Sequence, residues 1–307
     1  GETQNEPGDP ENSHNHGTYT LSTLGGSFEG QLYGPAYNAQ FLLAKTEDVS
    51  QEVPVEEDWY VAGLEWGESL GADVASSSLG YIDWYTYEDL DGQSAVTTIA
   101  VNIAIENGMV ITTAAGNSGS GGIIAPADAF EVLACGAVDS NGEIAGFSSW
   151  GPTADGRIKP DICARGVATF CADIVSPNSY REANGTSLST PLVGGAAAVI
   201  LSAHPSWTPL QVREALMMTA DNVENPDNQY GWGVIDVMAA INYFNATGDV
   251  NNDGILDILD VVVTVNYILG TIIPNESQIL IADMNEDGSL DVVDIVAMVS
   301  IIIGETF

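Results

Sequence analysis

The chain has 307 residues, 45% of them apolar, which is enough to bury the core of one large domain and a small one. Its 43 acidic and 6 basic residues give a formal net charge of −37, which argues against nucleic acid and anionic membranes as partners. No apolar stretch reaches the roughly 18–20 residues that a membrane span needs, so we expect none. The charge suits a halophilic or marine secreted protein and equally an ordinary acidic surface.

The first part of the chain predicts helices and strands in alternation. After a polar loop over residues 1–15, we expect a short helix at His16–Leu24 that ends at two glycines, and a buried strand at Gln40–Lys45. Helical spacing of apolar residues follows at Glu56–Ser69, and a strand is expected at Asp73–Leu79.

The alternation continues with a helix at Gln93–Asn107 and a strand at Met109–Ala115. Strands that alternate with helices build βαβ units. The sequence therefore predicts an α/β fold with a mostly parallel sheet that helices cover on both faces.

Turn and capping signals mark the elements that follow. Asp139–Gly142 is a hairpin-turn sequence. Thr208–Gln211 is a capping box with proline at the first helical position, and it opens a helix to about Ala220. A last helix is expected at Val234–Phe244, before a linker at residues 245–248.

Three cysteines, Cys135, Cys163 and Cys171, give no disulfide framework because their number is odd. Cys135 lies in an apolar run, and we expect it to be a small buried hydrophobic residue. Cys163 and Cys171 are close enough in sequence to pair across a hairpin, and the sequence leaves open whether they do.

Three polar residues carry the candidate catalytic chemistry. Ser187 precedes the uncharged run Leu192–Ala203, which predicts a buried helix, so the serine lies near a helix N-terminus that favours negative charge. His16 opens a helix and can act as a general base, and Asn117 follows a strand end where its amide can donate to an oxyanion. Each residue alone has an ordinary structural reading, above all as a cap. Together they are what acyl transfer through a covalent intermediate requires.

From about His16 to Ala240 the chain resembles the subtilisin-like serine peptidases, the subtilase family. The resemblance implies a three-layer α/β/α fold with Ser187 as nucleophile and His16 as general base. It also implies an oxyanion hole made by Asn117 and the backbone N–H of Ser187. The matching motifs, in order, are His16–Thr18, Ser78–Gly80, Ala114–Asn117, Gly136–Asp139, Phe147–Pro152, Gly185–Pro191 and Tyr230–Gly233.

The same resemblance implies a substrate cleft and a cis-proline. The cleft walls, which hold the substrate as an extended strand, would be Ser78, Leu79 and Gly80 on one side and Ala114, Ala115 and Gly116 on the other. Ala125-Pro126 falls where relatives place a cis peptide bond.

The triad aspartate has no evident counterpart. The family order is Asp, His, Ser. Asp9 is the only aspartate before His16, and it lies in a predicted loop with no strand before it. We therefore expect an N-terminally truncated chain whose triad Asp lies upstream of Gly1.

The C-terminal part repeats a calcium-loop pattern. Oxygen ligands at positions 1, 3, 5, 9 and 12, with glycine at position 6 and a backbone carbonyl at position 7, are the layout of a twelve-residue Ca²⁺ loop. The two predicted sets of ligands are Asp249, Asn251, Asp253, Ile255, Asp257 and Asp260, and Asp283, Asn285, Asp287, Ser289, Asp291 and Asp294.

Position 12 is aspartate in both loops, and no helix clearly enters either loop. In these respects residues 249–303 resemble a dockerin, a duplicated Ca²⁺ module that docks onto a cohesin domain. The pairs that usually help to choose the partner are Ile258-Leu259 and Val292-Val293, which are wholly apolar here. A calcium-stabilised module without a partner is the alternative.

We therefore expect a peptidase domain over residues 1–245 and a small all-α dockerin-like domain over residues 246–307. The function expected is that of a secreted or cell-surface serine endopeptidase with a polypeptide substrate, two Ca²⁺ ions and a cohesin-type scaffold partner. The alternative is a catalytically impaired subtilase-fold component that binds a scaffold through its dockerin-like domain. The sequence leaves open whether the peptidase domain holds further Ca²⁺.

Overall fold

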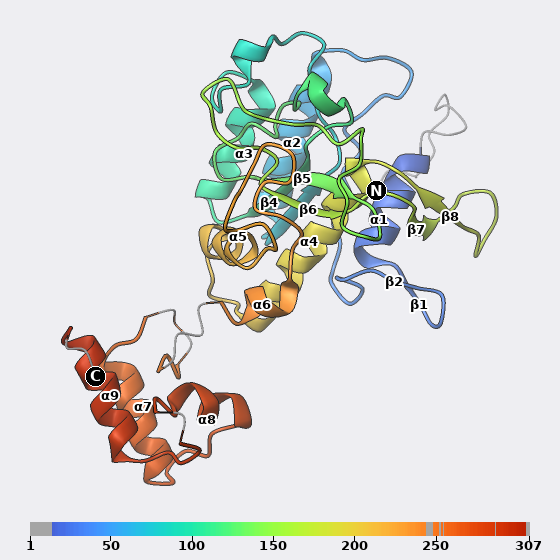
Figure 1. The fold of residues 1–307 in the computed structure, drawn as a ribbon. Coiled ribbons are helices and arrows are strands. Elements are labelled where there is room, and N and C mark those ends of the chain that lie inside the picture. Colours follow the sequence, from blue (N-terminus) through green and yellow to red (C-terminus); the bar gives the residue numbers. More distant parts are fainter. Residues whose placement is uncertain (1–13, 244–247, 252, 254, 286, 305–307) are drawn as a thin grey trace. The chain divides into compact units, whose positions relative to one another are not determined.

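The computed structural model describes residues 14–243, 248–251, 253, 255–285 and 287–304. Its internal contacts divide the chain into two units, Gly1–Val237 and Met238–Phe307 (Figure 1). The domain boundary expected at residues 245–246 stays a prediction, because residues 244–247 lie outside the described residues.

A four-stranded parallel sheet forms the centre of the first unit. Its strands lie in the order β3 (Val74–Ser77), β4 (Val110–Ala114), β5 (Leu133–Val138) and β6 (Ile162–Arg165). All residues of β4 and β5 are buried, whereas those of β3, at one edge, are only partly buried. The short apolar runs of β4 and β5 are typical of strands covered on both faces.

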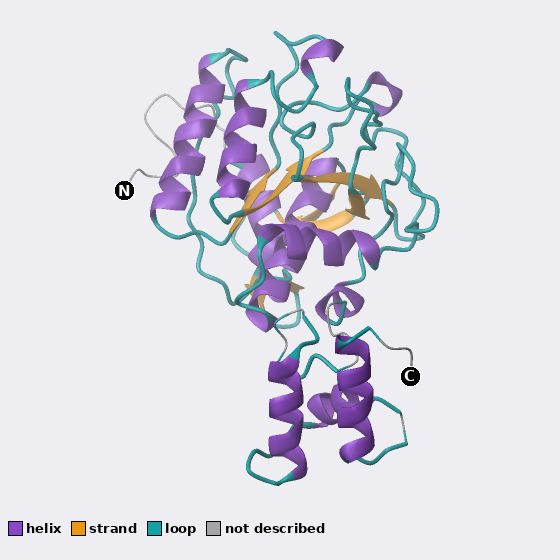
Figure 2. Cartoon of the chain, turned by 90° about the vertical axis from the view of Figure 1, so that its left-hand side faces the viewer, coloured by secondary structure: helices purple, strands orange, loops and turns teal. Residues whose placement is uncertain are grey.

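Helices cover the two faces of this sheet. Ile111 of β4 packs in one core cluster with residues of α2 (Val55–Ser69) and α3 (Val96–Glu106). The hydroxyl of the next residue, Thr112, donates to a backbone carbonyl of α4 (Thr186–Ala203). Because successive strand side chains point to opposite faces, α4 lies across the sheet from α2 and α3. The three-layer α/β/α arrangement is confirmed (Figure 2).

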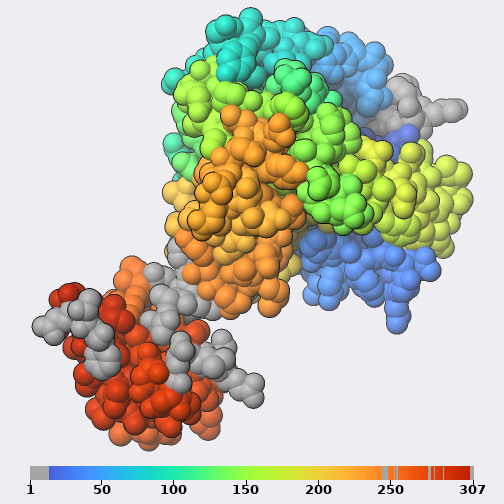
Figure 3. All heavy atoms as spheres, in the orientation of Figure 1, coloured from blue at the N-terminus to red at the C-terminus, as the bar shows by residue number. Residues whose placement is uncertain are grey.

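The helix α1 (Asn15–Gly25) lies beside α4 and beside the hairpin of β7 (Thr169–Ala172) and β8 (Tyr180–Ala183). In Figure 3, the blue segment near the N-terminus adjoins the yellow-green segment that contains the hairpin. The remaining elements of this unit are β1 (Ser27–Phe28), β2 (Leu32–Tyr33), two short 3₁₀ turns at Tyr87–Asp89 and Gly119–Gly121, and α5 (Pro209–Met218).

The strand predicted at Gln40–Lys45 is wrong. The segment is a loop, and the side chains of Phe41, Leu42 and Leu43 are exposed. An apolar run becomes a strand only where a neighbouring strand accepts its backbone hydrogen bonds. None of the described strands pairs with this segment.

The other elements predicted for this unit are present with small shifts at their ends. The turn at Asp139–Gly142 closes a hairpin in which Val138 pairs with Ile144. The Thr208 hydroxyl caps α5 reciprocally with Gln211, as the sequence predicted. The last predicted helix is shorter, α6 (Val237–Ile241), which begins at the last residue of this unit and continues into the second, and Phe244 lies outside the described residues.

The cysteines are free thiols, and all three are buried. Cys163 lies on β6 of the central sheet, whereas Cys171 lies on β7 of a separate two-stranded sheet. Their membership of different sheets excludes the hairpin pairing that the sequence allowed. The peptide bond Ala125-Pro126 is cis, as predicted, and Gly151-Pro152 and Lys159-Pro160 are cis as well.

Within the described residues, one helix meets the length and hydropathy of a membrane span, which corrects the expectation that no apolar stretch is long enough. This helix is α4, with 18 residues and a mean hydropathy of 1.4. However, 67% of it is buried inside the protein, which is typical of a core helix.

The second unit contains α7 (Ile258–Ile268), α8 (Glu276–Ala282) and α9 (Val292–Ile302). Its core gathers Val250, Val261, Tyr267, Ala282 and Met298. The helix α8 ends immediately before Asp283, so a helix does enter the second calcium loop, contrary to the prediction. Asp257 and Asp291 immediately precede α7 and α9, and the side chain of each accepts from the backbone N–H two residues ahead.

Candidate active site and calcium loops

Ser187 lies in the first turn of α4 and is 8% exposed. The helix begins after Gly185, whose φ of +147° and ψ of 155° fall in a region that is essentially restricted to glycine. The first N–H groups of a helix have no partner within it, so they give the N-terminus a partial positive charge. The backbone therefore brings the serine to a position where an oxyanion is stabilised.

The two predicted cleft walls follow the ends of adjacent parallel strands, β3 and β4. Ser78 contacts the nucleophile candidate directly, because its hydroxyl donates to the Ser187 carbonyl at 2.9 Å and its carbonyl accepts from Ser187 Oγ at 3.4 Å. On the other side, the carbonyl of Gly116 accepts from the Thr186 hydroxyl at 3.2 Å. Each wall therefore adjoins the first turn of α4, one of them through Ser78 and the other through Gly116. Leu79 and Gly80 follow Ser78 along the chain, and Ala114 and Ala115 precede Gly116.

Asn117 is oriented by the same helix turn. Its Oδ1 accepts from the backbone N–H of Thr186 at 2.9 Å and from the Thr186 hydroxyl at 3.1 Å. These two bonds fix the amide with its oxygen toward the helix. The Nδ2 group has no partner among the described residues, so it is available as a donor.

His16, Asn117 and Ser187 line one cavity of about 370 Å³. His16 lies in the first turn of α1, and the packing of α1 against α4 brings it there. Desolvation by the surrounding protein lowers the pKa of His16 below its ordinary value of 6.5, although its side chain remains exposed. Among the described residues the imidazole has no hydrogen-bond partner, and the Ser187 hydroxyl turns toward Ser78 instead.

The cavity also includes residues that the sequence did not single out. Tyr19 follows His16 by three positions on α1, and Arg181 comes from β8, 162 residues further along. No sequence pattern connects two residues so far apart. The only signal was composition, since Arg181 is one of six basic residues in the chain.

One carboxylate residue, Glu182, is among the described residues that line the cavity. It pairs across the hairpin with the exposed Phe170, whose ring stacks on that of Tyr180. Neighbouring residues of a strand point to opposite faces. The side chain of Glu182 therefore faces the outer side of the hairpin, away from α1.

The predicted calcium ligands of the first loop surround a buried position-12 carboxylate. Asp260 accepts from the backbone N–H of Asn251 at 3.1 Å and from that of Asp257 at 2.9 Å. The carboxylate of Asp249, at position 1, likewise accepts from the backbone N–H of Asp253 at 3.2 Å. Ile255, the predicted position-7 carbonyl, donates its own N–H to Asp253 at 3.0 Å.

The second loop repeats this arrangement. Asp294 accepts from the backbone N–H groups of Met284 and Asp291, at 2.9 and 2.8 Å. Asp287 donates its N–H to both Asp283 and Asn285, and the N–H of Ser289 donates to Asp287.

The donor set of both loops fits a hard cation. Asp249, Asp260 and Asp294 are fully buried and Asp283 is 7% exposed. Residues 246–307 contain no basic residue that could neutralise these carboxylates. Clustered buried carboxylates need a cation, and oxygen ligands of this kind suit Ca²⁺.

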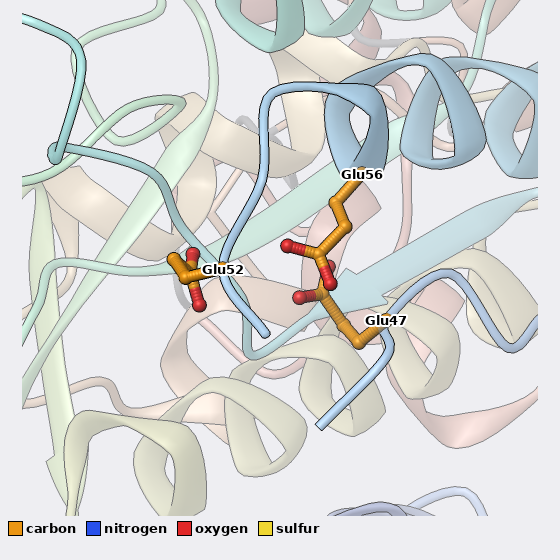
Figure 4. Close-up of side chains that lie close together, drawn as sticks. All are labelled: Glu47, Glu52 and Glu56. Carbon is orange, nitrogen blue, oxygen red and sulfur yellow. The ribbon is translucent and has the colours of Figure 1, made fainter. Parts of the chain in front are cut away.

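A further group of carboxylates was not predicted. Oxygens of Glu47, Glu52 and Glu56 lie within 4.8 Å of one another, and their side chains converge from one loop and the start of α2 (Figure 4). Glu56 is fully buried and accepts from the N–H groups of Asp48 and Val53. Burial, together with the charges of Glu56 and Glu52, raises the pKa of Glu47 to about 7, despite a hydrogen bond from Tyr81.

Comparisons with known proteins identify the families of both parts of the chain. The model of the subtilase family matches residues 2–233, and that of the dockerin type I domain matches residues 247–302. The chain is 36% identical over 232 residues to Subtilisin E of Bacillus subtilis, covering 73% of this chain and 55% of that protein. It is 34% identical over 239 residues to Subtilisin Savinase of Lederbergia lenta, covering 76% of this chain and 81% of that protein.

Among solved structures, the self-cleaved protease domain of PatA is similar, with a TM-score of 0.64 and 26% identity over 79% of this chain and 86% of that one. The chain thus spans about half the length of Subtilisin E and most of this protease domain. The motifs, the three-layer fold and these matches lead to one conclusion: the chain belongs to the subtilase family, and a dockerin type I domain follows its subtilase domain.

Proposed function

We propose that the protein is a secreted serine endopeptidase in which Ser187 is the nucleophile, His16 the general base and Asn117 an oxyanion donor. The observation that carries this proposal is the cavity that all three residues line, at the N-terminus of α4. Membership of the subtilase family supports the reaction class.

The proposed reaction proceeds through an acyl-enzyme. Ser187 Oγ attacks the peptide carbonyl while His16 takes the hydroxyl proton, and the imidazolium then donates a proton to the leaving amine. The tetrahedral oxyanion is held by Asn117 Nδ2 and the backbone N–H of Ser187, with support from the helix dipole. A water molecule then attacks the acyl-enzyme while His16 takes its proton. The imidazolium returns this proton to Ser187 Oγ, which leaves as the acid product is released.

The substrate is proposed to bind as an extended strand between the two cleft walls. These walls are Ser78–Gly80 and Ala114–Gly116, at the ends of β3 and β4. Gly116 has a φ of +113°, and a Cβ atom at this position would lie only 2.7 Å from Ser149 Oγ, so both the backbone and the space require glycine. The close packing of Gly116 on the buried Ser149 fixes the position of this wall.

A fluorophosphonate reagent tests the nucleophile. We expect it to label Ser187 in the folded chain, and Ser187→Ala to abolish both labelling and peptide hydrolysis. Ser189→Ala is the matched control, because Ser189 is buried in the same helix turn and its hydroxyl donates to the Thr186 carbonyl. A folded protein that resists the reagent at Ser187 would contradict the proposal.

A second candidate function follows from the surroundings of His16. The described residues offer this imidazole no carboxylate partner, because Glu182 faces away. In subtilisin, loss of the triad aspartate alone lowers kcat by roughly 3 × 10⁴. A catalytically impaired component that acts through its dockerin domain would show no proteolysis but Ca²⁺-dependent retention on a cohesin.

For the dockerin domain we propose two Ca²⁺ sites and a cohesin partner. The ligands would be those predicted from the sequence, with Asp260 and Asp294 as the buried position-12 carboxylates. The pairs Ile258-Leu259 and Val292-Val293 are exposed at the starts of α7 and α9, where a partner can reach them. Calcium titration by calorimetry and retention on an immobilised cohesin, with and without chelator, test the two parts separately. Secretion and attachment to an extracellular scaffold follow from this reading.

A further inference from the structure

The scissile bond divides a substrate peptide into an acyl half and a leaving half, which bind on two different sides of the cavity at Ser187. The proposed cleft walls receive the acyl half, and one of them adjoins Ser187, whose hydroxyl donates to the Ser78 carbonyl. His16 must hand its proton to the departing amine, so the part of the cavity around His16 receives the leaving half. Tyr19 lies one helical turn beyond His16 and belongs to this second side.

A fixed cation lines the same side. Arg181 Nη1 donates to the Tyr19 hydroxyl at 3.0 Å, and the guanidinium carbon lies 4.9 Å from the centre of the Tyr19 ring. Within the described part of the chain this is the only hydrogen bond of the five N–H groups that a guanidinium offers. Arg181 is exposed and lines the cavity, so a carboxylate bound there can accept from two of the remaining donors.

The neighbouring acid lies on the other face of the strand. Arg181 pairs across the hairpin with the buried Cys171 and shares the α1 side of the strand, whereas Glu182 pairs with Phe170 on the outer side. Acidic groups farther away than about 8 Å are screened at physiological ionic strength. Arg181 is the one arginine or lysine among the described residues that line the cavity, in a protein of strongly negative net charge.

We propose that Arg181 is a specificity-determining residue that selects peptides with an acidic side chain among the first two residues after the scissile bond. This inference rests on the proposed endopeptidase function. Tyr19 acts as the positioning residue that holds the guanidinium through its ring and hydroxyl.

The test uses peptides that are identical except for glutamate, glutamine or lysine at the first or second position after the scissile bond. For the 307-residue chain we expect kcat/KM to be about fivefold higher for glutamate than for glutamine, the upper range for an exposed ion pair. Arg181→Gln should bring the ratio to about one, and Arg181→Glu should favour lysine. Lys45→Gln is the matched control, since it removes the same charge from an exposed residue that does not line the cavity, and it should keep the wild-type ratio.

Binding measured on Ser187→Ala keeps the inference separate from catalysis. The affinities of fluorescent forms of the same peptides should show the same order, and the preference should fade in about 1 M salt. A glutamate preference in binding without any proteolysis would uphold the role of Arg181 and reject the endopeptidase function. Proteolysis with equal rates for glutamate and glutamine, or a preference that survives Arg181→Gln, would overturn the role of Arg181 alone.

Discussion

Replacing Asn117 by aspartate separates its two proposed roles. The Oδ1 atom accepts from the N–H and the hydroxyl of Thr186, at 2.9 and 3.1 Å, and a carboxylate can keep both bonds. The Nδ2 donor, by contrast, becomes an oxygen that repels the developing oxyanion. Asn117→Ala removes the acceptor and the donor together.

The two substitutions should have similar effects on catalysis, but only Asn117→Ala should lower stability. In subtilisin, loss of the oxyanion asparagine lowers kcat roughly 10²–10³-fold, and we expect at least this loss for both variants. Asn117→Ala leaves the N–H of Thr186 without its acceptor, which should lower the free energy of unfolding by about 1 kcal/mol. The charge of Asn117→Asp faces the N-terminus of α4, which should offset any cost by about 0.3–1 kcal/mol.

Steady-state hydrolysis of a chromogenic peptide and urea denaturation measure the two effects. The loss should fall on kcat with KM little changed, because the donor acts on the transition state. Asn141→Asp, in an exposed turn, is the matched control and should leave kcat as in the wild type. If Asn117→Asp kept kcat within about tenfold of the wild type, Asn117 would not be the oxyanion donor.

Four further outcomes follow from the geometry. In the pH profile of kcat/KM, the fall on the acid side should have its midpoint below pH 6.5, because desolvation lowers the pKa of His16. A midpoint above pH 6.5 would mean that a carboxylate contacts the imidazole. The folded state binds the proton of Glu47 more tightly than the unfolded chain does, so this group costs stability as the pH rises from about 4.5 to 7. Because solvent screens this half-buried side chain, Glu47→Gln, relative to wild type, should be only about 1–2 kcal/mol more stable at about pH 8 than at about pH 5 in urea titrations, and equal differences would refute the raised pKa. Asp260→Ala should reduce the calcium stoichiometry in calorimetry from two to one, and a chelator should melt residues 249–303 first; no effect of the chelator on thermal unfolding would count against the loops. Gly185→Ala should lower the free energy of unfolding by about 1–3 kcal/mol, because φ at this position is +147°, and a neutral effect in denaturation would contradict that strain.

Local sequence signals determined the elements and the motifs of this protein. The apolar spacing and glycine stops predicted α1, α2 and α3, and the capping box predicted the start of α5, because these signals act within one or two helical turns. The duplicated loops, each with an aspartate at position 12, were likewise evident, since calcium ligands of this type follow one another along the chain.

Pairing between distant segments was decided only by the tertiary structure. The run Phe41–Leu43 has a strand-like composition but lies exposed in a loop, because none of the described strands pairs with it. Cys163 and Cys171 are near in sequence yet belong to different sheets. The glutamates around Glu47 meet only because a loop folds back onto the start of α2.

The same division holds for the candidate active site. Sequence motifs indicated His16, Asn117 and Ser187. Small residues flank each of the three, and their motifs follow one another in the order of the subtilase family. The meeting of Tyr19 with Arg181 could not be predicted, because it depends on the packing of α1 against a hairpin that lies far along the chain. Local chemistry is encoded along the chain, whereas the charge that faces a substrate depends on which elements pack side by side.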